Sequence, residues 1–452
     1  MPLIGQQAVP FWVAPFGVRD GPDFVAHEAH ATLLCWRPGV IKGDGRWKLM
    51  LLDTNLKKRW DGLFEINNRY ELGYSLEETD GSGIWLFFKN ASEPLDTYFL
   101  YINYASGSSE SVQLRMPIAV EPELLLRTTE GMYMKATYEA EPIVLYCDLE
   151  QRRVQVLPKT FKRQFNICGM AANPARTQLW LFSKGETASR TQSTFQIFEQ
   201  GEEVGRQPVH VPKGFELGAA FAVFAKAGTY LMGTLLTEET DYSQGTFYAA
   251  IAPLEPVVIE RYSPFRGQPG FYAYLGQRRA ERARQKDANR PKKPLRGRYY
   301  HHAPRQVAGG RPLLLEHYYY RDPQPMAGPY GRAPYMPGEY LHDYMLVASY
   351  DTLGNAGPVV SFALPNLATL QVEGSITQSR QGKLWYLKHG ELFTLDSAGA
   401  AWEVQDGKKL GLGTARLLSI TQKLEDAVGG FVIWGEVEMP DHNRRFFVAR
   451  VR

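Results

Sequence analysis

The chain has 452 residues and a formal net charge of +3, with 44% hydrophobic and 22% charged residues. This balance is that of a folded globular protein and excludes disordered and collagen-like classes. No run approaches the roughly 20 apolar residues that a membrane-spanning helix needs. The three cysteines are too few for a disulfide framework and lack metal-site spacing, so we expect small buried side chains; they are Cys35, Cys147 and Cys168.

One pattern recurs along the chain: an aromatic or β-branched run, a turn containing Asp or Gly, and a second run. It is clearest in His342–Leu364, where the turn lies at Asp351. Asp bonds its own backbone two residues on, and Gly accepts positive φ, so both suit tight hairpins. Similar turns are predicted at Asp53, Asp148, Gly201 and Asp396–Ser397. Asp351 and Asp396 are 45 residues apart, the length of one four-stranded propeller blade.

In chain order, the pattern predicts short strands grouped in sets of about four. The predicted ranges are 31–37, 47–53, 56–66, 70–76, 83–89, 97–104, 110–118, 123–128, 131–138, 142–148, 152–157, 164–171, 178–184, 194–199, 204–211, 217–225, 229–237, 245–252, 256–262, 299–307, 311–319, 342–351, 358–364, 370–377, 382–389, 391–396, 401–404, 415–420, 430–436 and 444–451.

These sets predict an all-β fold, a β-propeller in a single domain over residues 1–452. Counting sets gives eight blades, with seven as the alternative if one terminal set is misread. The N-terminal segment Val9–Phe16 is expected to complete the final blade, because circular closure removes exposed sheet edges.

Two segments interrupt the strand pattern. Residues 263–299 contain strong helix formers and are predicted to be an inserted basic helical segment that ends at Pro291 and Pro294. From Pro264 to Arg298 there are eleven Lys or Arg and two acids, a local charge of +9, so the remainder carries about −6. Residues 321–341 are rich in Pro, Gly and Tyr and are predicted to be a loop.

No catalytic motif is present: the sequence has no nucleophile elbow, no P-loop and no dinucleotide fingerprint. We therefore predict no catalytic residue and no cofactor. Four histidines gather near Glu316 and Asp343, a composition that could ligate a metal; they are His301, His302, His317 and His342. Because adjacent residues of a strand point to opposite faces, His301 and His302 cannot serve one site. We favour histidines at loops and blade ends, with no metal, and we likewise expect His27 and His30 to lie in a loop.

The basic helix and the tyrosine-rich stretches are the best candidates for a recognition surface. Arginine clusters attract anionic partners, and loop tyrosines are common in interfaces. The alternatives without a binding role are a solvated helix and tyrosines that cover one face of the propeller. The candidate partner-binding residues are Arg278, Arg279, Arg282, Arg284, Tyr318, Tyr319, Tyr320, Tyr330 and Tyr335.

Three stretches resemble a group of uncharacterised β-propeller proteins of Bacteroidota bacteria with an inserted basic helix. They are LMLLDTNLKKRWDGLFEI, LMGTLLTEETDYSQGTFYAAI with the following FYAYLGQRRAERARQK, and EHYYYRDPQ with the following YLHDYMLVASYDTLGN. The resemblance implies a propeller with a helical insertion that works outside the cytoplasm, and no known catalytic residues. Since the N-terminus lacks a signal-peptide pattern, a periplasmic or outer-membrane-associated location implies that a signal has been removed.

Three functional hypotheses follow. The first is a non-enzymatic scaffold for protein–protein interaction in a bacterial cell-envelope assembly. The second is a carbohydrate-binding or carbohydrate-active propeller that uses Tyr, Trp and acidic residues at the central channel. The third and least favoured is a nucleic-acid binder that uses Arg278–Arg298. Two opposed carboxylates in the channel would favour the second.

Overall fold

A computed structural model describes the chain except for residues 1–10, 14–21, 23, 28–30, 38–45, 68, 79, 159, 161–164, 187–190, 226–227, 238–239, 253, 291–292, 305–310, 321–339, 352, 370–375, 379–383, 389–390, 399–400, 410–415, 426–430, 440–442 and 452. For some strand residues, chiefly after Leu364, only the backbone is described.

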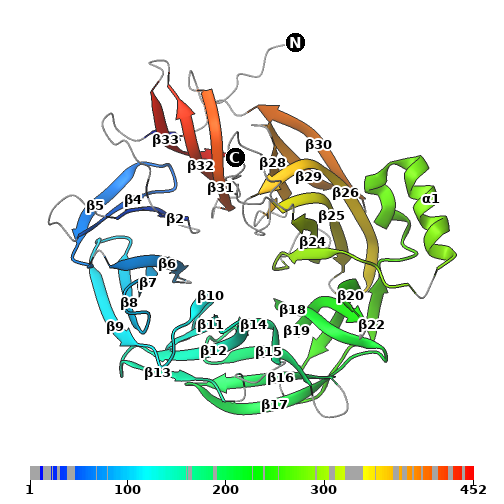
Figure 1. Ribbon diagram of the computed structural model, residues 1–452, viewed down its shortest axis with the longest axis horizontal. Coiled ribbons are helices and arrows are strands. Elements are labelled where there is room, and N and C mark those ends of the chain that lie inside the picture. Colours follow the sequence, from blue (N-terminus) through cyan, green and yellow to red (C-terminus); the bar gives the residue numbers. More distant parts are fainter. Residues whose placement is uncertain are drawn as a thin grey trace, which may run out of the picture.

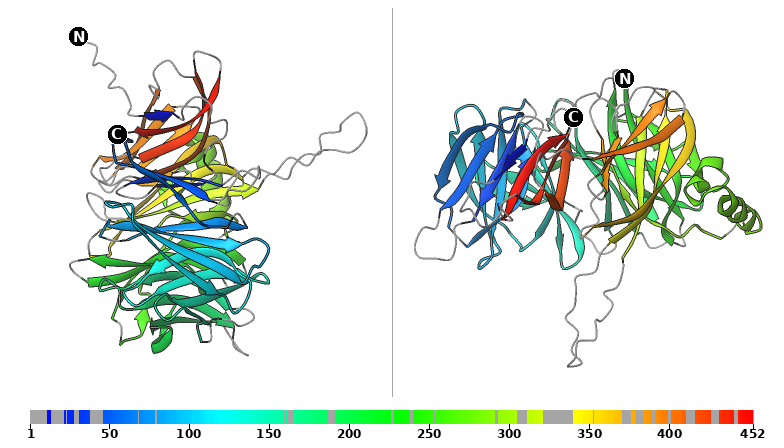
Figure 2. Two further views of the ribbon diagram at one scale, coloured as in Figure 1. Left: turned by 90° about the vertical axis from the view of Figure 1, so that its left-hand side faces the viewer. Right: turned by 90° about the horizontal axis from the view of Figure 1, so that it is seen from above.

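The described strands form eight sheets, seven of four strands and one of five, arranged around a ring (Figure 1). In six of the eight, four consecutive strands stand in chain order from the inside of the ring to the outside. The edge-on views in Figure 2 show neighbouring sheets standing face to face around the ring. This arrangement confirms the predicted all-β propeller.

The first four sheets use these strands: β2 (Phe24–His27), β3 (Thr32–Trp36), β4 (Trp47–Leu52), β5 (Lys58–Phe64); β6 (Tyr70–Glu77), β7 (Gly83–Asn90), β8 (Asp96–Asn103), β9 (Ser109–Arg115); β10 (Glu121–Arg127), β11 (Met132–Tyr138), β12 (Glu141–Asp148), β13 (Arg153–Val156); and β14 (Phe165–Ala172), β15 (Leu179–Glu186), β16 (Thr191–Glu199), β17 (Glu202–His210), with β21 (Val257–Val258) joining the last.

The other four sheets use these: β18 (Phe215–Ala225), β19 (Gly228–Thr237), β20 (Thr240–Ile251), β22 (Arg261–Pro264); β23 (Arg298–His301), β24 (Arg311–Tyr320), β25 (Tyr340–Tyr350), β26 (Ala356–Thr369); β27 (Ile376–Gln378), β28 (Leu384–Lys388), β29 (Glu391–Ala398), β30 (Ala401–Lys409); and β31 (Arg416–Glu425), β32 (Phe431–Glu438), β33 (Arg444–Val451), with β1 (Phe11–Val13). Between β22 and β23 lie the 3-10 helix η1 (Pro269–Leu275) and the helix α1 (Gln277–Ala288).

The two ends of the chain share one sheet. Strand β1 pairs antiparallel with β33, with Phe11 opposite Ala449. The prediction that an N-terminal segment completes the final sheet is confirmed for Phe11–Val13. Ring closure makes the first sheet and the last sheet neighbours, so every sheet has another sheet on both of its faces.

The predicted Asp turns join the third and fourth strands of several sheets. The Asp351 Oδ1 accepts hydrogen bonds from the backbone N–H groups of Leu353 and Asn355 at 2.9 and 2.7 Å. Asp53 and Asp148 act in the same way, and Gly201 has φ of 83°. The turn predicted at Asp396–Ser397 is wrong, because both residues are paired within the hairpin of β29 and β30.

Two further strand predictions need correction. His27 is the last residue of β2 rather than part of a loop, whereas His30 lies outside the described residues. The single strand predicted over Pro256–Tyr262 is two short strands. Val257–Val258 pairs parallel with β17, and Arg261–Pro264 pairs with β20. The chain leaves this sheet after β22, its outer strand, and continues into η1 and α1.

The cores lie between neighbouring sheets, as a ring of upright sheets requires. Cys35 and Cys147 are buried on strands as predicted, and Cys168 is partly buried on β14. In the described part of the chain, no helix has the length and apolar character needed to cross a bilayer.

Candidate functional site

The helix α1 stands outside the ring, beyond the outermost strand β26 of its sheet (Figure 1). It belongs to the connection between β22 and β23, the outer strand of one sheet and the inner strand of the next. The predicted helical insertion is therefore present, and α1 ends at Ala288, before Pro291. A helix of this length is marginal by itself in water, so its stability must come from contacts with the propeller.

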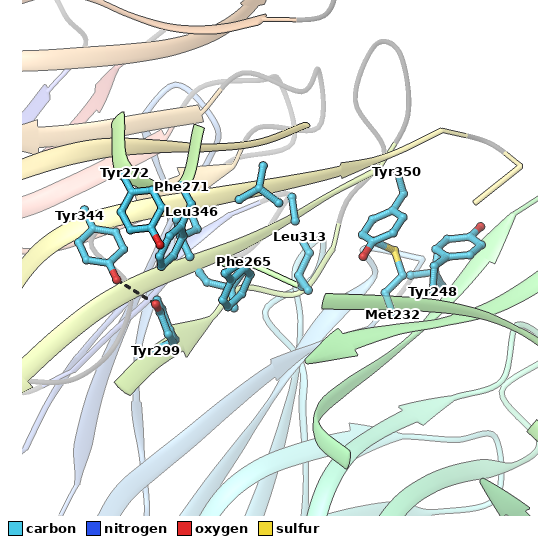
Figure 3. Close-up of a cluster of buried hydrophobic side chains, with 14 of the residues drawn as sticks. Met232, Tyr248, Phe265, Phe271, Tyr272, Tyr299, Leu313, Tyr344, Leu346 and Tyr350 are labelled. Atoms are coloured by element: carbon cyan, nitrogen blue, oxygen red, sulfur yellow. Dashed lines mark hydrogen bonds between the residues drawn. The ribbon is translucent and has the colours of Figure 1, made fainter. Parts of the chain in front are cut away.

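Aromatic side chains of η1 provide those contacts (Figure 3). Phe271 stacks on Phe265 with ring centroids 5.6 Å apart, and the ring of Tyr274 stacks on that of Tyr344 at 3.8 Å. The buried hydroxyls of Tyr344 and Tyr299 are hydrogen-bonded at 2.9 Å. These residues join the same buried cluster as strands of the two neighbouring sheets, so η1 is part of the core between them.

Gly270 lets η1 approach β26 closely. A Cβ atom at this position would lie 2.1 Å from the carbonyl oxygen of Val359. Beside it, the hydroxyl of Ser361 donates to the Gly270 carbonyl at 2.8 Å and accepts from the Tyr274 N–H at 3.1 Å. The position of η1 on β26 is thus fixed by backbone contact and by one serine.

The helix α1 is in turn tied to η1. Ala280 is buried, and Tyr272 donates a hydrogen bond to the Asp287 carboxylate at 2.5 Å. Burial, with the nearby Asp287, raises the pKa of Tyr272, so the phenol stays protonated and remains a donor. Arg266 lies 3.6 Å from the same carboxylate, and the Arg284 guanidinium donates to the Pro269 carbonyl at 3.0 Å. The helix is held in one orientation.

The face of α1 that points to solvent is cationic. Arg278, Arg279, Arg282 and Lys286 are all exposed, and no described residue forms an ion pair or hydrogen bond with their side chains. Residues three and four apart are neighbours on a helix, so these like charges repel one another at a cost of a few tenths of a kcal/mol per pair. The repulsion lowers the stability of the helix slightly, and no hydrogen bond or ion pair with the described chain offsets it.

The predicted tyrosine-rich surface is described only in part. Tyr319 is 43% exposed at the end of β24. Tyr318 is half-buried, with its ring 5.9 Å from that of Tyr340. The side chain of Tyr320 is not described, and Tyr330 and Tyr335 lie outside the described residues, as does most of the predicted loop 321–341. Tyr318 and Tyr319 belong to the inner side of the sheet, and α1 belongs to its outer side.

The prediction that the histidines lie in loops and at blade ends is wrong for His317 and His342, which lie within β24 and β25. His302 and His342 lie beside a buried carboxylate. The side chain of Glu316 on β24 is fully buried. Its Oε1 lies 2.6 Å from the His302 Nε2, and its Oε2 lies 3.1 Å from the His342 Nδ1. The His301 Nε2 is instead 3.4 Å from the Thr234 Oγ1 on a neighbouring sheet. The argument that His301 and His302 serve different sites is therefore confirmed.

The two histidines stabilise the ionised form of the buried Glu316 carboxyl group. Burial alone would raise the pKa of Glu316, but hydrogen bonds and charge interactions with His302 and His342 outweigh it and hold the pKa well below its usual value. Burial, with the nearby His302, lowers the pKa of His301 to about 4. Within the part of the chain that the structure describes, no three His, Cys, Asp or Glu side chains are arranged to hold a metal ion.

Carboxylates on the inner strands are held by cations from a neighbouring strand or sheet. Near the end of a second strand, a base meets a Glu on the first strand of the next sheet in three places. The pairs are Arg37–Glu71 at 3.2 Å, Lys89–Glu121 at 2.6 Å and Lys184–Glu216 at 2.9 Å. Within one sheet, Lys135 lies 2.7 Å from Glu123. These carboxylates link strands and sheets.

The pKa values of two of these acids agree with that role. Burial would raise the pKa of Glu216, yet hydrogen bonds from Lys184 and Thr191 lower it below the usual value. Lys135 and Thr137 do the same for Glu123 against burial. A general acid for glycoside hydrolysis needs a raised pKa instead.

Sequence reasoning missed the Glu316 cluster and the inter-sheet ion pairs. A signal for the first was available, because Glu316 directly follows the apolar run PLLL within a predicted strand. Its partners could not be inferred, because His302, Glu316 and His342 meet through the register of three strands. No sequence signal identifies the ion pairs, since they join sheets that the chain pattern does not align.

No family model and no curated protein sequence matches this chain. Among solved structures, a prolyl endopeptidase is similar with a TM-score of 0.43 and 11% identity, over 96% of this chain and 54% of that one. The β-propeller domain of the Trilobed protease from Pyrococcus furiosus gives 0.36 and 12%, over 84% and 96%. The Dos1 propeller gives 0.39 and 10%, over 79% and 72%. The chain spans about half the length of the prolyl endopeptidase, and likeness at this level of identity concerns the fold alone.

Proposed function

We propose that this protein is a non-enzymatic propeller scaffold that binds a partner protein through the solvent face of α1. The observation that carries the proposal is the combination of firm anchoring and unpaired charge. Aromatic packing, Ser361 and the Tyr272–Asp287 hydrogen bond fix the helix. The side chains of Arg278, Arg279, Arg282 and Lys286 form no ion pair or hydrogen bond with another described residue. A surface held in its binding conformation loses little entropy when a partner docks.

The bacterial cell-envelope setting of the scaffold rests on the resemblance to the Bacteroidota propellers. Cell fractionation of a native host tests it, and recovery of the full-length protein in the cytosolic fraction would contradict it.

The carbohydrate-active alternative has less support. It requires a pair of acids with different protonation states at the channel. On the described inner strands, Glu71, Glu121, Glu123 and Glu216 each have a cationic partner, and the pKa values of Glu123 and Glu216 are lowered.

Affinity capture from native cells tests the partner proposal. The bait is the full chain, either unchanged or with Arg278→Glu, Arg279→Glu, Arg282→Glu and Lys286→Glu combined. A matched control reverses four exposed cations on other sheets or their connections: Lys57, Arg59, Arg153 and Lys213.

We expect one protein to be recovered in stoichiometric amount by the unchanged chain and by the control, and to be lost with the helix variant. All replaced side chains are exposed, so the thermal midpoints should agree closely. If no stoichiometric partner is recovered, or if the helix variant retains it, the proposal is wrong.

A further inference from the structure

The cationic surface does not stop at α1. Four more described bases follow it, Arg290, Lys293, Arg296 and Arg298, and each is exposed. No hydrogen bond or ion pair within the described chain involves their side chains. The backbone turns after the helix, where the Lys293 N–H donates to the Arg290 carbonyl at 3.1 Å, and then runs into β23.

Contacts along this segment fix its path. The Gln244 side chain exchanges two hydrogen bonds with the backbone of Leu295, at 2.8 and 3.1 Å. Gly297 lies against His317, because a Cβ there would be 2.9 Å from the imidazole. Arg298 stands opposite Tyr318 in the pairing of β23 with β24. The segment is therefore attached to the propeller at its middle and at its end.

The path leads from the rim to the inner side of the sheet. The helix α1 lies beyond β26, the fourth strand, and β23 is the first strand. Three strand spacings correspond to about 14 Å, and the 12 residues of α1 add a length of roughly 18 Å. The path along the chain from the start of α1 to β23 is thus on the order of 30 Å, and it ends at Arg298, opposite Tyr318.

We propose that this cationic track, made of the solvent face of α1 and of Arg290, Lys293, Arg296 and Arg298, binds an acidic, extended segment of the partner protein. This inference rests on the proposed function and adds the chemistry of the partner and the direction of its path. Carboxylates along the segment pair with the arginines, whose planar donors suit bidentate contact. The tyrosines at the inner end contact its last residues.

Charge and shape favour an acidic protein segment over other polyanions. An amphipathic helix binds a membrane by burying an apolar face, but Ala280 of α1 is turned into the protein. The chain outside Pro264–Arg298 carries about −6, the difference between +3 overall and +9 locally. A nucleic acid long enough to leave the track would meet this acidic body, whereas a short acidic segment contacts the track alone.

Fluorescence anisotropy with a synthetic probe tests the inference. The probe is a peptide of about 16 residues with Glu at every second position, which can extend over roughly 50 Å. Its control replaces every Glu by Gln. Two variants of the full chain are compared. The track variant combines Arg290→Gln, Lys293→Gln, Arg296→Gln and Arg298→Gln. The distant variant combines Lys57→Gln, Arg59→Gln, Arg153→Gln and Lys213→Gln.

The Glu peptide should bind, the Gln peptide should not, and the track variant should weaken binding about tenfold, as expected when four exposed charge contacts are lost. The distant variant should bind as the unchanged chain does. A probe of about five residues, roughly 17 Å when extended, is too short to span both α1 and the segment that follows it. The track variant should therefore weaken the binding of this short probe less than that of the long probe.

Equal binding of the Glu and Gln peptides, an unchanged affinity of the track variant, or tighter binding of a single-stranded oligonucleotide of similar length would overturn the inference. These results differ from failure of the proposed function. If native partner capture still depends on α1 while the track variant binds the Glu peptide normally, only the path is wrong. If capture depends on α1 while the Glu and Gln peptides bind alike, only the acidic chemistry is wrong.

Discussion

Replacing Gly270 by Ala should loosen the whole insertion. The new Cβ would lie 2.1 Å from the Val359 oxygen and 3.2 Å from the Val360 Cα, both backbone atoms that no side-chain rotation can move away. Ordinary contact requires η1 and β26 to separate by roughly 1 Å. Such a shift stretches both hydrogen bonds of Ser361, now 2.8 and 3.1 Å. Overpacking and weakened hydrogen bonding together predict a loss of about 2–4 kcal/mol.

The assay is chemical denaturation combined with limited trypsin digestion, because the arginines of α1 are cleavage sites. Gly205→Ala is the matched control, since a Cβ there makes an ordinary 3.5 Å contact with Ile197. We expect cleavage in residues 278–290 to accelerate in Gly270→Ala well below the denaturation midpoint. If both variants unfold within about 0.5 kcal/mol of each other and are cleaved alike, the reasoning about close backbone approach is refuted.

Three more outcomes follow from the same contacts. Ser361→Ala removes both hydrogen bonds to η1 and should lower the free energy of unfolding by about 1–2 kcal/mol, measured by urea denaturation; no change would show that the serine is dispensable. The pKa of His301 is lowered to about 4, so the unfolded chain takes up this proton first as the pH falls. Stability present above pH 6.5 should be lost between pH 6.5 and 4, by up to about 3 kcal/mol, and His301→Gln should remove that part of the slope. Glu316→Gln breaks a buried charge pair and should cost about 3 kcal/mol at pH 7, whereas exposed Glu281→Gln should change stability little; equal midpoints for the two would contradict the buried-charge account.

Glu316 makes a second contribution to the loss of folding stability at low pH, and it acts in the same direction as that of His301. The pKa of Glu316 is depressed in the folded protein, so its stabilisation is complete above the usual glutamate pKa. It is lost as the pH falls through the folded-state value. The Glu316→Gln variant should lack this loss of stability at low pH. It should keep the loss between pH 6.5 and 4 that is assigned to His301.

Local chemistry made much of the fold predictable. Alternating aromatic and β-branched residues predict strands from neighbouring residues alone. The turn Asp of a hairpin likewise bonds to backbone groups within four residues, as Asp351 does. The helix after Gly276 was likewise predictable from its helix formers and the prolines that follow. Where two short strands share one apolar run, as in Pro256–Tyr262, the sequence gives no means of dividing them between sheets.

The amino-acid sequence by itself determined the repeated antiparallel hairpins and the exposed arginines of the insertion, because both depend on neighbours a few residues away. Only the tertiary structure decided that His302 and His342 surround Glu316, that inner-strand acids pair with cations of a neighbouring strand or sheet, and that η1 packs on β26. These contacts join residues from different strands or sheets, and their geometry is set by strand register and ring closure, which no local pattern encodes.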